Sequence, residues 1–137
     1  MEITMDTTLF DKYRAEIEEE LDLSDFNIKD VQMKLPAIKH KWVARLIQQK
    51  IELNNYKKLK SEAIDNIVQN TRKENPVLLS DAALAKQAEK HNTVQKINLK
   101  IDECEILIEY LEKVEKVCSS TSFDIKNLVD IKKMELG

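Results

Sequence analysis

The sequence has 137 residues, enough for one domain with one core, and contains only one Gly and two Pro residues. Antiparallel sheet folds need frequent turns built largely from those residues, so the composition disfavours them and predicts helices. The formal net charge of −3 hides an uneven distribution, because residues 1–30 contain 3 basic and 10 acidic residues whereas residues 31–60 contain 8 basic and 1 acidic.

Motifs of catalysis and of membrane insertion are absent from the sequence. No apolar run approaches the ~18 residues of a membrane span, and the N-terminal sequence MEITMDTTLF lacks the basic and apolar regions of a signal peptide. There is no Gly-rich phosphate loop, no GxSxG, no HExxH and no CxxC. We therefore expect a non-enzymatic protein of the cytoplasm, without a cofactor, a metal site or a membrane partner.

The acidic N-terminal region, residues 9–34, is predicted to begin with an amphipathic helix. Its apolar residues recur at near-helical spacing: Leu9, Tyr13, Ile17 and Leu21. Thr8 to Asp11 fits a capping box. The pattern predicts a helix over about residues 9–21, followed by a short helix or an extended segment up to Lys34.

A long basic helix, residues 36–70, is predicted to follow. Pro36 favours a helix start because proline is tolerated in the first turn, where its missing N–H costs nothing. No Gly or Pro interrupts the chain from there to Pro76, and one apolar stripe runs along it: Leu35, Ile38, Trp42, Leu46, Leu53, Tyr56, Ala63 and Ile67. The polar sequence TRKENPV, residues 71–77, then predicts a loop.

A second long helix, residues 80–118, and a short C-terminal helix, residues 122–136, are predicted for the rest of the chain. Ser80 is a good N-cap, and no helix breaker follows it up to Cys118. The apolar residues alternate at spacings of three and four: Val94, Ile97, Ile101, Cys104, Ile108 and Leu111. The sequence SSTS at residues 119–122 predicts a break, and Thr121 to Asp124 matches a second capping box.

The predicted fold class is all-α, with long antiparallel helices and short N- and C-terminal helices in a single domain over residues 1–137. Leu107 and Val114 widen the apolar stripe beyond a two-helix seam, so we expect a further helical surface from another copy in a homo-oligomer. Cys104 and Cys118 lie at equivalent heptad positions, too far apart along one helix to be bridged. Both are therefore expected to be reduced packing residues.

The basic helix is the candidate nucleic-acid-binding surface. Seven basic residues are assigned to it: Lys39, Lys41, Arg45, Lys50, Lys57, Lys58 and Lys60. Like charges at i,i+4, such as Lys41 and Arg45, repel by about 0.2–0.5 kcal/mol per pair, so a polyanion would be stabilising there. Phosphate backbones bind such surfaces through counterion release, and Trp42 or Tyr56 would stack on bases if exposed.

An internal partner for the basic helix is an equally good interpretation of the charges. The acidic first helix would lie against it, within one chain or between copies, through these residues: Glu16, Glu18, Glu19 and Glu20. Trp42 is then a core residue, and the protein is a helical adaptor or coiled-coil structural subunit that binds no nucleic acid. Metal binding is not expected, because neither His40 nor His91 has a Glu three residues before it and acids along solvated helix faces are common.

Two stretches of the chain carry the features of a known family. The sequence LDLSDFNIKDVQMKLPAIKHKW passes through a Leu-Pro step to Lys41-Trp42 and a basic helix. At the C-terminus, Tyr110, Leu111 and Val114 precede SSTSFDIKNLVDIKKMELG, which ends in a closing helix and Gly. Together they resemble the UvsY family, the recombination mediators of T4-like phages, over most of the chain and at matching length.

The resemblance implies a function. A protein of this kind binds single-stranded DNA, contacts a RecA-like recombinase and the single-strand-binding protein, and promotes loading of the recombinase onto DNA that the latter covers. It further implies a phage-encoded protein in the cytoplasm of the host cell, and a ring-like homo-oligomer assembled through the C-terminal helices. The sequence departs from the family pattern after residues 57–60, which continue into SEAIDNIVQN without the family's paired Tyr and Gly.

Overall fold

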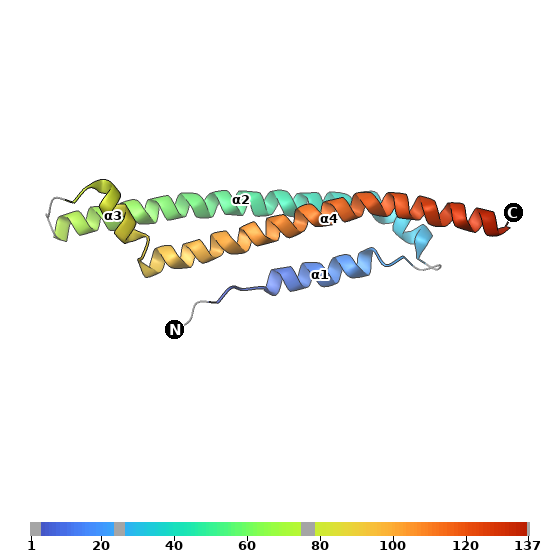
Figure 1. Ribbon diagram of the computed structural model, residues 1–137, viewed down its shortest axis with the longest axis horizontal. Helices are drawn as coiled ribbons and strands as arrows, with labels where there is room; N and C mark the ends of the chain where they lie inside the picture. The colour runs from blue at the N-terminus through green and yellow to red at the C-terminus, as the bar shows by residue number, and fades with distance from the viewer. Residues whose placement is uncertain (1–3, 24–26, 75–78, 137) are drawn as a thin grey trace. The chain divides into compact units, whose positions relative to one another are not determined.

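The computed structural model describes residues 4–23, 27–74 and 79–136, and over these ranges the chain forms four helices and no strand (Figure 1). The helices are α1 (Thr8–Glu20), α2 (Ile28–Glu74), α3 (Asp81–Ala88) and α4 (Asn92–Leu136). The predicted all-α class is confirmed. Within these ranges, no helix is both long enough and apolar enough to cross a membrane.

Two compact units are built along the two long helices. The α1 unit comprises the described residues from 7 to 48 and from 107 to 136, and the α3 unit comprises those from 4 to 6 and from 49 to 106. In both units α2 and α4 run antiparallel, as predicted. That the two units unfold together as one domain stays a prediction.

The core of the α1 unit is a three-helix cluster. Tyr13 and Ile17 of α1 contribute to it together with residues of α2 and α4: Ile38, Trp42, Leu46, Leu107, Leu111, Val114 and Cys118. A second cluster joins the start of α2 to the C-terminal part of α4: Ile28, Val31, Leu35 and Ile125. The third helical surface that was expected from another copy against Leu107 and Val114 is therefore provided by α1 of the same chain, and that expectation was wrong.

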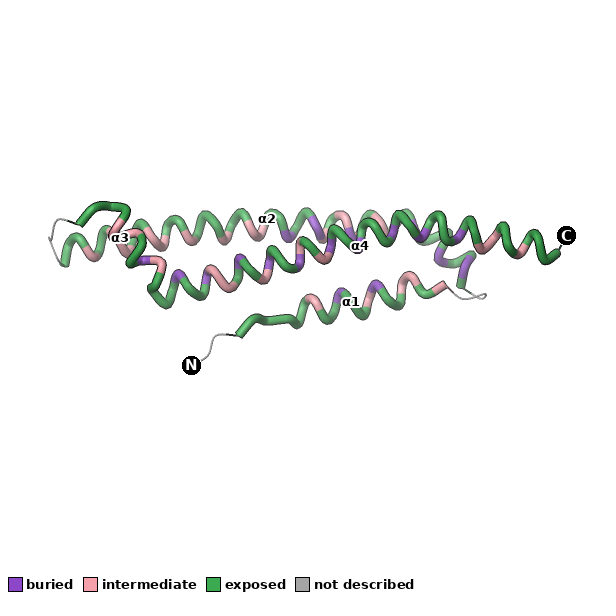
Figure 2. The backbone as a smooth tube through the Cα atoms, in the orientation of Figure 1, coloured by how far each residue is buried: buried purple, intermediate pink, exposed green. Residues whose placement is uncertain are grey.

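The α3 unit has a more one-sided core. Its buried apolar residues come from α3 and α4: Leu84, Ala88, Val94, Ile97, Ile101 and Cys104. On α2, Leu53, Tyr56 and Ile67 of the predicted stripe are only half-buried, and between residues 50 and 74 no residue is fully buried (Figure 2). The stripe therefore faces its partner helices here but stays partly accessible.

Helix α2 begins eight residues earlier than predicted and runs through Pro36. It also ends at Glu74, so residues 71–74 of the predicted loop are helical, and the rest of that loop lies outside the described residues. The residue four positions before this proline is Gln32, and its carbonyl loses an intrahelical partner. Both Gln32 and Pro36 are exposed, so water can satisfy that carbonyl. Because Val31, Leu35 and Ile38 are buried on either side of the proline, continued packing outweighs its cost of ~3 kcal/mol.

The helix predicted over residues 80–118 is interrupted after Ala88. Helix α3 ends in two tight turns, each closed by a hydrogen bond to the carbonyl three residues earlier. Lys90 N–H donates to the carbonyl of Gln87 (3.1 Å), and His91 N–H donates to that of Ala88 (2.9 Å). The His91 Nδ1 then accepts from Thr93 N–H at 3.2 Å and caps the start of α4. No Gly or Pro marks this break, which is why the sequence pattern missed it.

The break predicted at residues 119–122 does not occur, and α4 continues to Leu136 as one helix. Thr121 is buried, and its hydroxyl donates to the carbonyl of Val117 at 2.8 Å, one turn back in the same helix. The hydroxyl is thus satisfied without ending the helix. The N-cap predicted at Ser80 is confirmed by its bond from Ala83 N–H (3.2 Å), whereas α1 starts after Thr7, which forms no side-chain cap.

Candidate nucleic-acid interface

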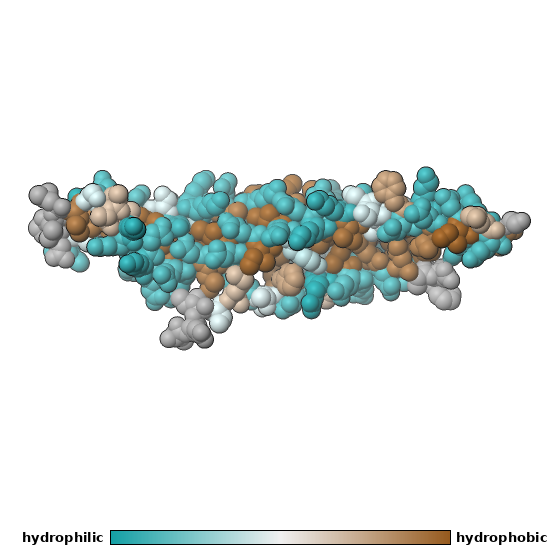
Figure 3. Space-filling model, viewed as in Figure 1, coloured by the Kyte–Doolittle hydropathy of each residue, from teal (hydrophilic) through white to brown (hydrophobic). Residues whose placement is uncertain are grey.

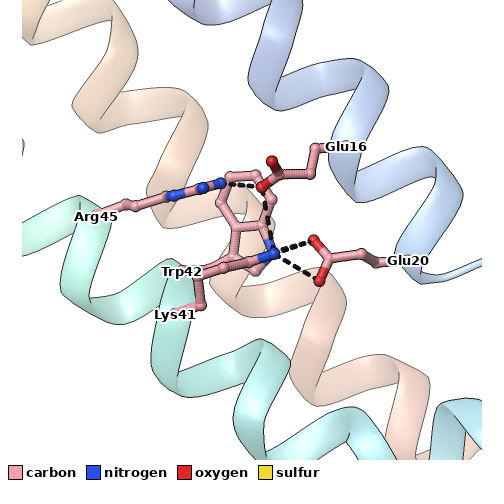
Figure 4. Close-up of polar contacts among 5 residues, drawn as sticks. All are labelled: Glu16, Glu20, Lys41, Trp42 and Arg45. Atoms are coloured by element: carbon pink, nitrogen blue, oxygen red, sulfur yellow. Dashed lines mark hydrogen bonds and ion pairs between the residues drawn. The ribbon is translucent and has the colours of Figure 1, made fainter.

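Two of the seven predicted DNA-binding residues, Lys41 and Arg45, are paired with carboxylates of α1. The Lys41 Nζ lies 2.7 Å from the Glu20 carboxylate and 3.2 Å from Glu16 Oε2, and Arg45 Nη1 donates to Glu16 (Figure 4). The side chains are only 20–37% exposed, so water screens them incompletely. The acidic first helix therefore neutralises this part of the basic helix within one chain.

Trp42 is a core residue at the centre of this cluster. It is 1% exposed, its ring meets that of Tyr13 edge-on at 5.3 Å, and its Nε1–H donates to Glu20 at 3.2 Å. The Arg45 guanidinium lies 4.6 Å from the Tyr13 ring centre and 4.8 Å from that of Trp42, which is cation–π geometry. Because its ring is buried and its N–H is engaged, Trp42 is not available for stacking on bases in this structure.

The two cations act on the acidity of Glu16. The pKa of the Glu16 carboxyl is lowered below its usual value of 4.5, mainly by the hydrogen bond from Arg45. The hydrogen bond from Lys41 adds to this effect, whereas partial burial opposes it. A carboxyl whose pKa is lower in the folded than in the unfolded protein stabilises the fold at pH values above its unfolded-state pKa. That contribution is lost as the pH falls through the lowered pKa.

Replacing Glu16 with Gln is expected to remove a pH-dependent part of the stability. At pH 7 the variant should lose about 1–2 kcal/mol, because charged hydrogen bonds to Arg45 and Lys41 are broken. The difference from the wild type should shrink towards zero as the pH falls from about 4.5 into the range where Glu16 is protonated. Urea unfolding of both proteins between pH 3 and 7 measures the difference in stability, and Glu19→Gln, at an exposed position of the same helix, is the control. A difference that does not change with pH would contradict the stabilising role of the Glu16 carboxylate.

The other five predicted residues lie in different surroundings. Lys39 is half-buried in the α1 unit, and Lys60 is half-buried in the α3 unit with its Nζ 3.3 Å from Glu89. Lys50, Lys57 and Lys58 are exposed. Among the described residues, no ion pair or hydrogen bond engages Lys57 or Lys58. Among the seven, these two lysines therefore combine exposure with the absence of such a contact to a described residue.

A polar face of α2 surrounds these accessible lysines. At about 100° per residue, Lys50, Asn54, Lys57 and Ser61 share one face, and Lys58 lies at its edge. All five are exposed. We call them the α2 cationic face. Asn54 and Ser61 were not among the predicted residues, although the helical period aligns their donors with the lysines.

The described residues do not assemble a metal site, since no group of three or more His, Cys, Asp or Glu side chains is placed to hold an ion. Cys104 and Cys118 are free and buried, as predicted, and burial raises the pKa of both thiols. They pack in the cores of their respective units.

The fold, in contrast to the sequence, has clear relatives. Neither a family model nor a curated protein matches the chain. Two crystal structures of UvsY, the recombination mediator protein of bacteriophage T4, match it at TM-scores of 0.76 and 0.74, with 14% and 13% sequence identity. The first match covers 91% of this chain and 97% of UvsY, and the second covers 93% and 97%. The chain therefore has a UvsY-like fold along nearly its whole length.

Proposed function

We propose that the protein is a recombination mediator. It would bind single-stranded DNA and promote loading of a RecA-like recombinase onto DNA covered by single-strand-binding protein, in the cytoplasm of a phage-infected host cell. The observation that carries this proposal is the match of almost the entire chain to UvsY, a protein described as a recombination mediator.

The α2 cationic face is the proposed DNA-binding surface. Lys57 and Lys58 are exposed and not committed to acids among the described residues, so they can release counterions to phosphates. Asn54 and Ser61 add neutral donors between the charges. Lys41 and Arg45 have their charges matched by α1, so we propose a structural role for both instead of the DNA contact that their sequence positions indicated.

Self-association is proposed to occur through the C-terminal part of α4. The large apolar residues exposed there include Phe123, Ile131 and Met134, which are 71%, 51% and 80% accessible. At about 100° per residue they lie within one quarter of the helix circumference. Brown apolar side chains are visible over this part of α4 (Figure 3). A ring-like homo-oligomer built on this face would repeat the α2 cationic face along a DNA strand.

Replacing Lys57 and Lys58 together with Ala is expected to weaken binding of oligo-dT and to reduce its salt dependence. For single strands each phosphate contact contributes about 0.7 to the slope of log K against log salt concentration, so loss of two contacts should reduce the slope by about 1.4. Fluorescence anisotropy over a series of salt concentrations measures this. The matched control is K86A/K90A, which removes two exposed lysines of the same unit.

An unchanged slope in K57A/K58A would remove the α2 cationic face from the site. The absence of any wild-type binding at low salt would contradict the mediator function as a whole. That outcome would favour the alternative, a non-enzymatic helical adaptor, for which the pairing of α1 with Lys41 and Arg45 is the supporting observation.

A further inference from the structure

A groove of about 630 Å³ lies in the α1 unit between the first turns of α2 and the C-terminal part of α4. Leu35 and Ile125 line it and are themselves almost fully buried, with 6% and 2% of their surfaces exposed. Pro36 and the half-buried Val129 extend this apolar lining. The groove therefore has an apolar strip along its floor, and clefts with an apolar lining commonly mark binding sites.

Lysines surround this apolar strip. The lining residues include three lysines, Lys39, Lys126 and Lys133. Asp130 is the one acid among the lining residues. Within the described parts of the chain, no ion pair involves any of these three lysines, although Lys34 nearby is paired with its own helix. The groove thus combines apolar contacts with a positive charge that is not balanced by acids.

The same chain shows which kind of segment binds such a surface. The buried residues of α2 have a flank on either side, and the groove lies on one of them. On the other flank, helix α1 packs its apolar residues between α2 and α4 and pairs its carboxylates with Lys41 and Arg45. At about 100° per residue, Pro36 and Lys39 lie on the flank opposite to these two cations. The groove repeats the combination of apolar seam and lysines on the flank that α1 leaves open.

We propose that this groove is the docking site for an acidic amphipathic helix of a partner protein. The lining residues on α4 run from Ser122 to Lys133, a stretch of about 18 Å at ~1.5 Å per residue, so about three helical turns fit. The apolar face of the partner helix contacts Pro36 and Val129 above the buried Leu35 and Ile125, and its carboxylates reach the three lysines. This inference goes beyond DNA binding, and neither site requires the other.

A labelled peptide tests the proposal directly. The probe is a fluorescein-labelled peptide of residues 7–21, an acidic amphipathic segment that suits the groove, and a version with its four Glu residues replaced by Lys serves as a charge control. Exchange with the resident α1 is suppressed, because the tethered helix has an effective concentration in the millimolar range. The full-length protein is expected to bind the acidic peptide in a salt-sensitive manner and not the basic one.

Two variants locate the binding. K126E/K133E reverses the charge of the groove, and S122W fills it without changing charge; each is expected to weaken peptide binding at least tenfold. K113E/K116E reverses two exposed lysines of the same helix outside the groove and should leave binding unchanged. Circular dichroism verifies the helical fold of each variant.

Other outcomes would overturn the docking site. No anisotropy change with the acidic peptide would do so, as would binding that survives both groove variants. If S122W alters the sedimentation of the protein alone, the groove is a contact between copies of this chain. If K126E/K133E weakens oligo-dT binding and leaves peptide binding intact, the lysines belong to a nucleic-acid site. A failure of DNA binding with intact peptide binding would affect only the proposed function.

Discussion

Replacing Trp42 with Ala should lower the free energy of unfolding by about 3–5 kcal/mol, the usual range for removing a large aromatic side chain from a core. The indole is 1% exposed and packs with α1, α2 and α4 at once, so its loss leaves a cavity that no single helix can close by a local shift. The substitution also leaves the Glu20 carboxylate without its indole donor and uncovers the guanidinium of Arg45.

Urea unfolding at a fixed protein concentration measures this loss, since self-association would make stability depend on concentration. Trp42→Phe keeps an aromatic ring and removes the hydrogen bond, so it should cost less than Trp42→Ala. Ile47→Ala, at a half-exposed position of the same helix, should change stability by no more than ~0.5 kcal/mol. A loss below 1 kcal/mol in Trp42→Ala would contradict the role of the indole as the centre of the core.

The two buried cysteines report whether this loss spreads along the chain. Cys118 lies in the α1 unit with Trp42, and Cys104 lies in the α3 unit. If the chain is one cooperative domain, Trp42→Ala should raise the rate of thiol labelling equally at both residues, as measured by mass spectrometry of tryptic peptides. Faster labelling of Cys118 alone would show that the α1 unit opens independently, against the single-domain prediction.

The sequence was sufficient for the helical class and for the apolar stripe of α2. Scarce Gly and Pro together with 3.6-residue periodicity predict helices reliably, and Leu35, Ile38, Trp42 and Leu46 are all buried as expected. Helix ends were less predictable. Pro36 locally favours a helix start over an interior position, and only the burial of Val31 and Leu35 before it outweighs that preference.

The candidate site was predictable only in part, because sequence spacing places charges on a helix but not on its neighbours. Lys41 and Lys57 are equivalent in the basic segment, yet the first pairs with Glu16 and Glu20 and the second is exposed. The two lysines differ because Lys41 lies on the side of α2 that α1 covers and Lys57 does not. The charges of Lys41 and Arg45 are therefore paired internally, whereas Lys57 and Lys58 further along the same helix are exposed.

The same distinction bears on assembly. The expectation of a homo-oligomer began from Leu107 and Val114, but α1 covers both within one chain. The proposed assembly depends instead on exposed apolar residues further along α4, namely Phe123, Ile131 and Met134. Their substitution is not expected to disturb the core, because they point away from it.

If the proposed oligomer forms, replacing Phe123 and Met134 together with Glu is expected to convert it into monomers and to weaken binding to a long oligo-dT by about 10²-fold. The loss follows from multivalency, since linked binding sites raise overall affinity by about 10²–10⁴ without any new contact. Binding to a strand long enough for one subunit should be nearly unchanged.

Analytical ultracentrifugation measures the assembly state, and anisotropy measures the binding of each strand. The matched control is I106E/V117E, which adds the same charge at two half-exposed positions of α4. A wild-type monomer, or a dispersed variant that binds long strands normally, would separate DNA binding from assembly and remove avidity from the proposed mechanism.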